Sequence, residues 1–313
     1  EPDGNFPTVV YPNPEEAEAL SLALKKAEEI DADLVMATDP DSDRVGIAVK
    51  NDKGAFQLMN GNQTGSLLLY YLLRKWQENG KLTGKEYVVK TIVTTDLISR
   101  IAEKYDVTLY NTLTGFKYIA EVIRDLEGKE QFIGGGEESY GYLIGDSVRD
   151  KDAIASCAMI AEMAAWAKSE NTSLYDLLKQ IHGEFGLFQE SLKSLTKTGK
   201  SGAEEINELM VKFRNDPPSS LGGSKVKTLI DYKSCEEKDL VSGVSSKINF
   251  PSSNVLQFIT EDGSKISVRP SGTEPKIKFY FSVNSAVNDL ESYDQTVEKL
   301  QGKTNKIMEE LGL

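Results

Sequence analysis

Hydrophobic and polar positions follow two spacings over the first half of the chain. An apolar side chain every three or four positions in residues 15–30 predicts a helix, with Asn13 and Pro14 as its cap and first turn. Short apolar and β-branched runs predict strands at 33–38, 45–49, 87–94, 107–110 and 132–133. Longer apolar segments predict helices at 66–76, 97–105, 116–126 and 154–167. This alternation of strands and helices indicates an α/β layered domain.

The pattern changes after about residue 186. Strand patterns at 255–259, 264–268 and 277–283 predict an antiparallel meander, with Asp262-Gly263 as the turn between the first two strands. A final helix is predicted from the spacing of Val297, Leu300, Ile307 and Leu311. We therefore expect a separate domain of α+β character after the α/β domain.

Composition narrows the possible functions. The chain has 313 residues, with 36 Lys and Arg against 49 Asp and Glu, and a formal net charge of −13. This length favours about two domains, and the acidic balance argues against nucleic acid or an anionic membrane as the main partner. No apolar run reaches the roughly 18 residues that a membrane span needs. The two cysteines and the single histidine exclude a disulfide framework and a His-rich zinc site, so we expect a cytoplasmic protein with free thiols.

The first candidate site follows the predicted strand 33–38, in the segment Thr38-Asp39-Pro40-Asp41-Ser42-Asp43-Arg44. Three aspartates alternate along it, and Pro40 favours a tight loop that turns Asp39, Asp41 and Asp43 toward one point. Converging carboxylate oxygens are the ligands that Mg²⁺ takes in proteins. The segment therefore predicts a magnesium site.

The acidic loop has interpretations other than a magnesium site. An EF-hand is excluded, because Arg44 stands where that loop needs glycine and Lys50 where it needs glutamate. Residues 41–45 also fit the Asp-x-Asp-x-Thr/Val pattern of haloacid-dehalogenase-type phosphatases, in which Asp41 would be the nucleophile. An ordinary acidic turn is the third possibility, and both alternatives stay open.

The second candidate site is glycine-rich and has the sequence Gly134-Gly135-Gly136-Glu137-Glu138-Ser139-Tyr140-Gly141. Glycine lets another molecule approach the backbone closely. The carboxylate of Glu137 and the hydroxyl of Ser139 are a suitable pair for binding a polyol, because the one accepts and the other donates or accepts hydrogen bonds. A glycine-rich turn with solvated acids is the alternative.

The third candidate site is the segment Arg269-Pro270-Ser271-Gly272-Thr273-Glu274-Pro275-Lys276-Ile277-Lys278. Arg269 offers a planar fork to a phosphate, and Ser271 and Thr273 add hydroxyl donors. Gly272 permits a nest of backbone N–H groups that binds anions. This concentration of cations in an acidic protein predicts a phosphate-binding loop, with a structural turn as the alternative.

Together these segments resemble the α-D-phosphohexomutase family, which includes phosphoglucomutases and phosphomannomutases. The family's motifs occur in the family's order: a metal loop at 39–44, a cleft segment at 114–117, a sugar loop at 136–139 and a phosphate loop at 269–278. By itself, the segment at 114–117 would indicate only a strand-to-helix turn. The resemblance covers nearly the whole chain, and four loops in one order are a highly specific match.

The resemblance implies a fold, a domain layout and a set of site residues. The fold would be one complete mixed α/β domain of the phosphohexomutase type and a C-terminal α+β domain, preceded by a remnant of another α/β domain. Residues 1–60 would be the end of domain 2 with the metal loop, 61–185 domain 3 with the sugar loop, and 186–313 domain 4 with the phosphate loop.

The implied metal ligands are Asp39, Asp41 and Asp43, and the implied catalytic residue beside the phosphoryl group is Arg44. The implied substrate-binding residues are Thr114, Gly115, Lys117, Glu137, Ser139 and Lys151. The implied phosphate-binding residues are Arg269, Ser271, Gly272, Thr273 and Lys278.

The activity implied by the resemblance is that of a phosphoglucomutase or phosphomannomutase. Such enzymes move a phosphoryl group between C1 and C6 of glucose or mannose phosphate, by way of a phosphoserine and a hexose bisphosphate. Mg²⁺ would be the cofactor, and glucose 1,6-bisphosphate the activator and intermediate. A phosphopentomutase of the same family is the alternative. Sugar phosphates are the expected partners, while the preferred sugar and the oligomeric state stay open.

One departure from the family's pattern limits this implied activity. The family's nucleophile is a serine in a Ser-His-Asn-Pro-like loop, whereas the only histidine here is His182, in Ile181-His182-Gly183. The chain also begins at Glu1 rather than Met and shows no signal peptide. We therefore expect a processed or truncated C-terminal portion of a longer enzyme, which by itself is inactive as a mutase.

Overall fold

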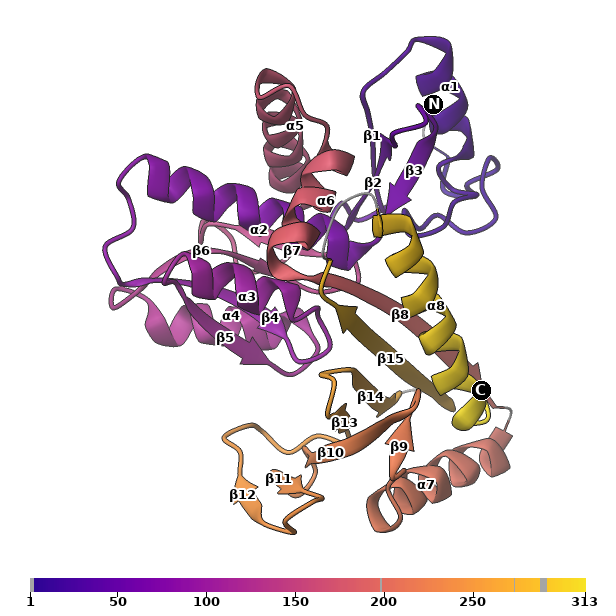
Figure 1. The fold of residues 1–313 in the computed structure, drawn as a ribbon. Helices are drawn as coiled ribbons and strands as arrows, with labels where there is room; N and C mark the ends of the chain where they lie inside the picture. The colour runs from indigo at the N-terminus through magenta and orange to yellow at the C-terminus, as the bar shows by residue number, and fades with distance from the viewer. Residues whose placement is uncertain (1–2, 198, 273, 288–291) are drawn as a thin grey trace. The chain divides into compact units, whose positions relative to one another are not determined.

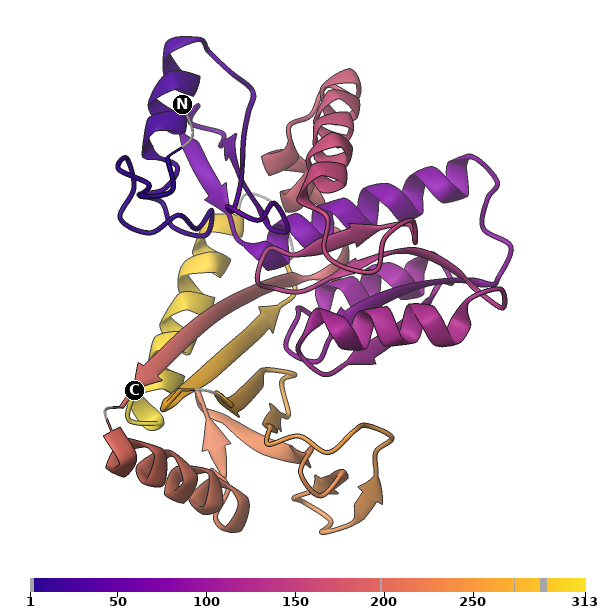
Figure 2. The ribbon, with the colours of Figure 1, turned by 180° about the vertical axis from the view of Figure 1, so that it is seen from behind.

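The computed structural model describes residues 3–197, 199–272, 274–287 and 292–313. The chain divides into two compact units, Glu1–Phe185 and Gly186–Leu313, whose elements are labelled in Figure 1 and seen from behind in Figure 2. None of the described helices is long and apolar enough to cross a membrane.

The first unit begins with a three-stranded antiparallel sheet. Its order is β1-β2-β3, formed by Leu34–Thr38, Val45–Lys50 and Phe56–Met59. Helix α1 (Ser21–Glu29) packs on this sheet, because its buried Ala27 joins an apolar cluster with strand residues such as Val35 and Ala48. The acidic loop connects β1 to β2, so the register of these two strands fixes both ends of the loop.

The second sheet of this unit is mixed and has the order β5-β4-β6-β7. The strands are β4 (Glu86–Thr91), β5 (Thr108–Thr112), β6 (Gln131–Gly136) and β7 (Tyr142–Ile144). The first three run parallel, and β7 runs antiparallel to β6. The helices of this layer are α2 (Gly61–Glu78), α3 (Leu97–Lys104), α4 (Phe116–Leu126), α5 (Ala153–Ser169) and α6 (Leu174–Phe185). The glycine-rich segment lies at the end of β6, and β7 continues from it.

Two helices cover opposite faces of this sheet. On α4, Phe116, Ile119 and Ile123 recur at helical spacing and pack against Tyr87 and Val89 of β4, which share one face because side chains alternate along a strand. Helix α2 lies on the other face, where a Cβ at Gly134 would be 3.2 Å from a methyl carbon of Leu72. This layered packing positions the carboxyl ends of the parallel strands, where the candidate loops begin.

The ends of these two helices are set by local chemistry. Helix α2 begins with a capping box, in which the side chain of Asn60 accepts the N–H of Gln63 and the side chain of Gln63 accepts the N–H of Asn60. Helix α4 begins after Gly115, whose φ of 117° is open to glycine but strained for other residues. The glycine of the cleft segment is therefore required by the turn from β5 into α4.

The second unit is built on an antiparallel sheet of eight strands. Its order is β12-β11-β10-β13-β14-β15-β8, and β9 pairs with β10. The strands are β8 (Leu187–Thr196), β9 (Ser220–Leu221), β10 (Ser224–Asp231), β11 (Glu236–Asp239), β12 (Ser245–Lys247), β13 (Leu256–Thr260), β14 (Lys265–Pro270) and β15 (Lys276–Ser285). Helices α7 (Gly199–Asn215) and α8 (Tyr293–Glu310) pack on it through a core that includes Ile277, Phe279 and Phe281, alternate residues of β15.

The predicted fold class is confirmed, with mixed α/β layers followed by an α+β unit. The helix predicted at 116–126 has those bounds, and the predicted meander is formed by β13, β14 and β15. The sequence patterns missed β8 and α7, because their outward residues are polar and their apolar positions are few.

Two predicted elements have different bounds in the structure. The helix predicted at 15–30 begins only at Ser21, because the N–H groups of Glu16 and Ala19 bond to the third residue back, in separate turns rather than a helix. The strand predicted at 87–94 ends at Thr91, where the chain turns and the N–H of Thr94 bonds to the carbonyl of Thr91. This turn presents the two threonine hydroxyls to the glycine-rich segment.

Candidate functional site

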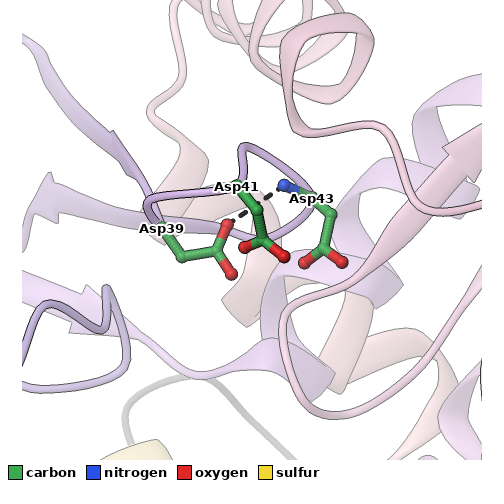
Figure 3. Close-up of side chains that lie close together, drawn as sticks. All are labelled: Asp39, Asp41 and Asp43. Atoms are coloured by element: carbon green, nitrogen blue, oxygen red, sulfur yellow. Dashed lines mark hydrogen bonds between the residues drawn. The ribbon is translucent and has the colours of Figure 1, made fainter.

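The loop between β1 and β2 gathers three carboxylates. One carboxylate oxygen from each of Asp39, Asp41 and Asp43 lies within 4.8 Å of the others, and Figure 3 shows the three carboxyl groups side by side. The loop is fixed by Asp39, whose Oδ1 accepts the main-chain N–H groups of Asp43 and Arg44, each at 3.0 Å. The convergence expected from the alternating aspartates is therefore present in the structure.

These carboxylates are only partly compensated by nearby cations. The Nε atom of Arg44 lies 3.9 Å from Asp39 Oδ2 and 3.7 Å from Asp43 Oδ1, and Lys151 Nζ lies 3.0 Å from Asp43 Oδ2. Burial raises the pKa of Asp39 above its ordinary value; the N–H of Arg44 opposes this effect, and the neighbouring Asp41 reinforces it. Asp43 Oδ1 is buried and accepts no hydrogen bond from the described residues.

This donor set fits a divalent cation. Carboxylate oxygens are the hard ligands that Mg²⁺ prefers, and it is usually held by one or two of them together with water or phosphate. The buried Asp43 Oδ1 accepts no hydrogen bond from the described residues, and its cationic neighbour there, Arg44 Nε, lies 3.7 Å away, so this oxygen lacks a close positive partner. A cation held by Asp39, Asp41 and Asp43 would supply that partner.

The glycine-rich segment, which contains the predicted sugar loop, is in direct contact with the cleft segment. Glu137 Oε1 accepts the main-chain N–H of Gly115 at 2.8 Å, so two of the predicted substrate-binding residues are in direct contact. Thr114 and Ser139 are partly buried, and Lys117 is exposed with its Nζ 4.8 Å from the centre of the Tyr118 ring. The structure thus brings the two predicted segments together from different parts of the sequence.

Close backbone contacts explain several glycines around this loop. A Cβ at Gly61 would lie 1.9 Å from the carbonyl oxygen of Glu138, and a Cβ at Gly141 would lie 2.3 Å from Lys151 Cδ. At Gly61 the neighbour is backbone, so only glycine allows the approach, whereas at Gly141 a side chain would force the Lys151 stem to shift. The loop is therefore packed tightly against α2 on one side and against the Lys151 side chain on the other.

Two main-chain hydrogen bonds connect the acidic loop with the layer that carries the sugar loop. The N–H of Val45 donates to the carbonyl of Tyr140 at 3.0 Å, and the N–H of Ala153 donates to the carbonyl of Ser42 at 3.1 Å. Lys151 also reaches across, with its Nζ 5.3 Å from the centre of the Phe116 ring at the start of α4. The predicted metal and sugar loops therefore form one connected site within the first unit.

An open groove of about 920 Å³ extends from this site along α4. Its cationic lining comes from Lys117, Arg124, Arg149 and Lys151. Glu121 and Asp150 are its acidic members, and each lies within ion-pair distance of one of these cations. The groove is thus a local exception to the acidic composition of the chain, and it favours an anionic ligand.

The predicted phosphate loop lies in the second unit, between β14 and β15. Arg269 and Lys278 face each other as partners across these strands, and the N–H of Ser271 donates to the carbonyl of Lys276 at 2.7 Å. Arg269 forms no ion pair with any residue that the structure describes, and a Cβ at Gly272 would have open space. Thr273 lies outside the described residues. The described part of the loop offers a guanidinium and a main-chain turn to an anion.

Two residues of the first-unit site were missed by the sequence reasoning. Glu138 accepts hydrogen bonds from the hydroxyls of Thr91 and Thr94 at 3.3 and 3.2 Å, and burial, followed by the charge of Glu137, raises its pKa. Arg149 lines the groove two positions before Lys151. Arg149 could have been predicted, because a basic residue so close to Lys151 is a candidate for the same site. Glu138 could not, because the sequence Glu137-Glu138 does not show which carboxylate bonds to the threonine hydroxyls.

An α/β layered unit with a carboxylate cluster beside a cationic groove defines a class of protein suited to anionic ligands held near a divalent cation. Comparison with known proteins identifies the family within that class. Family models match residues 1–54 (phosphoglucomutase/phosphomannomutase, alpha/beta/alpha domain II), 60–185 (alpha/beta/alpha domain III) and 225–299 (C-terminal domain). The chain belongs to the phosphoglucomutase/phosphomannomutase family, which confirms the resemblance seen in its motifs.

Individual relatives agree with this family. A phosphoglucomutase of Staphylococcus haemolyticus is 39% identical over 94% of this chain, and one of Staphylococcus aureus strain USA300 is 39% identical over 96%. The crystal structure of parafusin, a phosphoglucomutase from Paramecium, covers 95% of the chain with a TM-score of 0.61 at 20% identity, which supports the fold. The chain spans about half the length of these relatives, namely 53%, 52% and 50%.

Proposed function

We propose that this chain provides the cation-, sugar- and phosphate-binding loops of a phosphosugar mutase. The complete enzyme would move a phosphoryl group between C1 and C6 of glucose or mannose phosphate, through a phosphoserine and a hexose 1,6-bisphosphate. The observation that carries the proposal is the cluster of Asp39, Asp41 and Asp43, connected through Lys151 to the predicted substrate cleft. The division into 1–60, 61–185 and 186–313 is proposed with it.

Each loop would have one role in this function. Asp39, Asp41 and Asp43 would hold Mg²⁺, which would neutralise charge on the phosphoryl group. Arg44 would lie beside that group, because its guanidinium already lies next to two of the three carboxylates. Positioning and charge stabilisation dominate phosphoryl transfer in general, so residues that only bind and orient are central to it.

The sugar and its second phosphate would be held by the remaining residues. Glu137 and Ser139 would bind sugar hydroxyls, and Thr114, Gly115, Lys117 and Lys151 would line the cleft. Arg269, Ser271, Gly272, Thr273 and Lys278 would bind the phosphate that is not reacting. Because a bisphosphate has to bind in two orientations, the phosphate loop should recognise phosphate rather than sugar, and glucose 1,6-bisphosphate should bind as well.

Binding of glucose 1-phosphate to the full chain tests this function. Calorimetry should show binding that Mg²⁺ strengthens. Arg269→Ala should weaken it by at least about tenfold, because a charge-assisted hydrogen bond to phosphate is lost. Lys247→Ala is a matched control, since this lysine is exposed on β12 in the same unit and outside the loop. Equal affinities for the wild-type chain and Arg269→Ala would contradict the phosphate-binding role.

Turnover separates the mutase from its rival. The chain by itself should not convert glucose 1-phosphate to glucose 6-phosphate in a coupled assay, because the serine loop of the family is absent from its sequence. Normal turnover would contradict this expectation. A phosphatase that uses Asp41 would instead be trapped by beryllofluoride as an aspartyl-phosphate mimic, and that result would replace the proposed function.

A further inference from the structure

Lys151 lies between the two loops of the first unit and contacts both. Its Nζ is 3.0 Å from Asp43 Oδ2 and 3.0 Å from Asp150 Oδ1. The same ammonium lies 5.3 Å from the centre of the Phe116 ring and lines the cationic groove. Its side chain is 15% exposed. One cation is thus shared by the carboxylate cluster and the groove.

The surroundings of Lys151 leave it a route from one partner to the other. A Cβ at Gly141 would lie 2.3 Å from its Cδ, so the missing side chain at this position makes room for the lysine stem. Asp150 is its chain neighbour and lines the same groove, and it can stay paired with the ammonium when the contact with Asp43 is broken. Lys117 and Arg149 line the groove into which the ammonium would move.

We propose that Lys151 is a positioning residue that exchanges Asp43 for the anionic group of the substrate when a divalent cation binds. This inference rests on the proposed function, because it takes the carboxylate cluster as the cation site. In the structure, the Lys151 ammonium pairs with one carboxylate oxygen of the cluster. A divalent cation bound there brings two positive charges close to the ammonium and withdraws the negative charge that held it.

The exchange couples two binding events. The ammonium that leaves Asp43 joins the cations of the groove, where a phosphate or another anion gains its charge. Cation binding therefore raises the affinity for the sugar phosphate, and the sugar phosphate raises the affinity for the cation by the same factor, because coupling between two sites is reciprocal. Lys151 would thus prevent strong capture of substrate before the cation is present.

Removal of the ammonium separates competition from coupling. Lys151→Met keeps an aliphatic stem against Phe116 and removes the charge. In calorimetry with Mg²⁺ alone, the variant should bind Mg²⁺ about tenfold more tightly than the wild-type chain, because a competing cation is gone. Glucose 1-phosphate should bind more weakly, and Mg²⁺ should strengthen its binding by a clearly smaller factor than in the wild-type chain.

A second lysine of the groove is the matched control. Lys117→Met removes an exposed ammonium whose described ring contact is with Tyr118 rather than with the acidic loop. It should weaken binding of glucose 1-phosphate, leave the affinity for Mg²⁺ unchanged, and retain the strengthening by Mg²⁺. Circular dichroism and thermal unfolding of both variants check that the fold is intact.

Three outcomes decide the inference. An unchanged affinity for Mg²⁺ in Lys151→Met overturns the exchange, whatever the sugar phosphate does. Full strengthening by Mg²⁺ in this variant overturns the coupling. If the wild-type chain binds Mg²⁺ but not glucose 1-phosphate, the proposed function fails, while tighter Mg²⁺ binding by Lys151→Met still supports the exchange at Asp43.

Nuclear magnetic resonance gives a readout independent of affinity. The ¹³Cε–¹Hε signal of Lys151, assigned by its loss in Lys151→Met, should shift when Mg²⁺ is added to the wild-type chain. The signal of Lys117 should stay in place. A Lys151 signal that does not respond to saturating Mg²⁺ overturns the exchange directly.

Discussion

The acidic loop after β1 and the glycine-rich loop after β6 occupy the same place in two similar arrangements. In each, a helix leads into a strand, an acidic loop follows, and the next strand returns antiparallel: α1-β1-β2 in the first case and α4-β6-β7 in the second. The loops differ in how their carboxylates are satisfied. Asp43 Oδ1 has no hydrogen-bond donor among the described residues, whereas Glu137 and Glu138 both accept hydrogen bonds from the protein.

This difference shows how one backbone arrangement supports two kinds of site. In the first loop Asp39 is fixed by two main-chain N–H groups and Asp43 Oδ2 is paired with Lys151, but Asp43 Oδ1 accepts no hydrogen bond from the described residues. This oxygen stays available to a cation, so the first loop is suited to a metal. A carboxylate fixed by N–H or O–H donors is held in a defined orientation and can use its remaining oxygen for a hydroxyl ligand. The two loops therefore differ in the carboxylate oxygen that their donors leave unused, rather than in the acidic residues themselves.

The largest expected effect comes from the packing behind the second loop. A Cβ at Gly61 would lie 1.9 Å from the carbonyl oxygen of Glu138 and 2.9 Å from the N of Tyr140, both of them backbone atoms that cannot rotate away. Gly61→Ala should therefore lower the free energy of unfolding by about 3 kcal/mol. Urea unfolding measures this loss. Gly4→Ala, where no atom lies within 4 Å of the added Cβ, is the control and should leave stability unchanged. Equal stability of the two variants would show that the loop is not rigidly packed.

A smaller effect is expected from the first loop, where Asp39 and Asp41 should differ. Asp39 Oδ1 accepts two main-chain N–H groups, while Asp41 is exposed and accepts no main-chain N–H from the described residues of the loop. Without divalent cations, Asp39→Ala should lower the free energy of unfolding by about 2 kcal/mol. Asp41→Ala should change it by less than about 0.5 kcal/mol, the range of ordinary surface substitutions. Urea unfolding in the presence of a chelator measures both, and a similar loss in the two variants would contradict a supporting role of Asp39.

Much of the fold could be predicted from the sequence, because buried faces leave a periodic pattern. The helix at 116–126 and the meander of the second unit were predicted from such patterns and are confirmed. The helix predicted at 15–30 was too long, because the pattern of apolar positions does not reveal that 15–20 form separate turns. Strand β8 was missed, because most of its residues are polar and only its first two are fully buried.

The candidate site was predictable in its residue types but not in its contacts. The alternating aspartates indicated a cation site, and the three side chains do converge. The sequence contained no sign that Lys151 bonds to Asp43 or that Gly115 donates to Glu137, because both pairs are far apart along the chain. Gly115 and Glu137 meet where α4 and β6 begin and end, and Lys151 reaches Asp43 where α5 packs against β1 and β2. Long-range polar contacts depend on the folded arrangement of both layers.

The smallest expected effect concerns Glu138 and distinguishes a structural carboxylate from a ligand-binding one. Burial and the charge of Glu137 raise the pKa of Glu138 above its ordinary value of 4.5, so the folded protein holds its charged form at some cost. This penalty is present in full when the pH is above the pKa of Glu138 in the folded protein. It disappears as the pH falls toward 4.5, because Glu138 then becomes protonated in the folded protein before it does in the unfolded chain.

Glu138→Gln keeps an oxygen that can accept from Thr91 and Thr94 and removes the charge. It should therefore raise the free energy of unfolding by about 1 kcal/mol near pH 8, and the gain should vanish near pH 4. Urea unfolding across this range measures the difference from the wild-type chain. A loss at pH 8 would mean that the charge of Glu138 stabilises the fold, and a gain that is independent of pH would mean that it does not arise from removal of this charge.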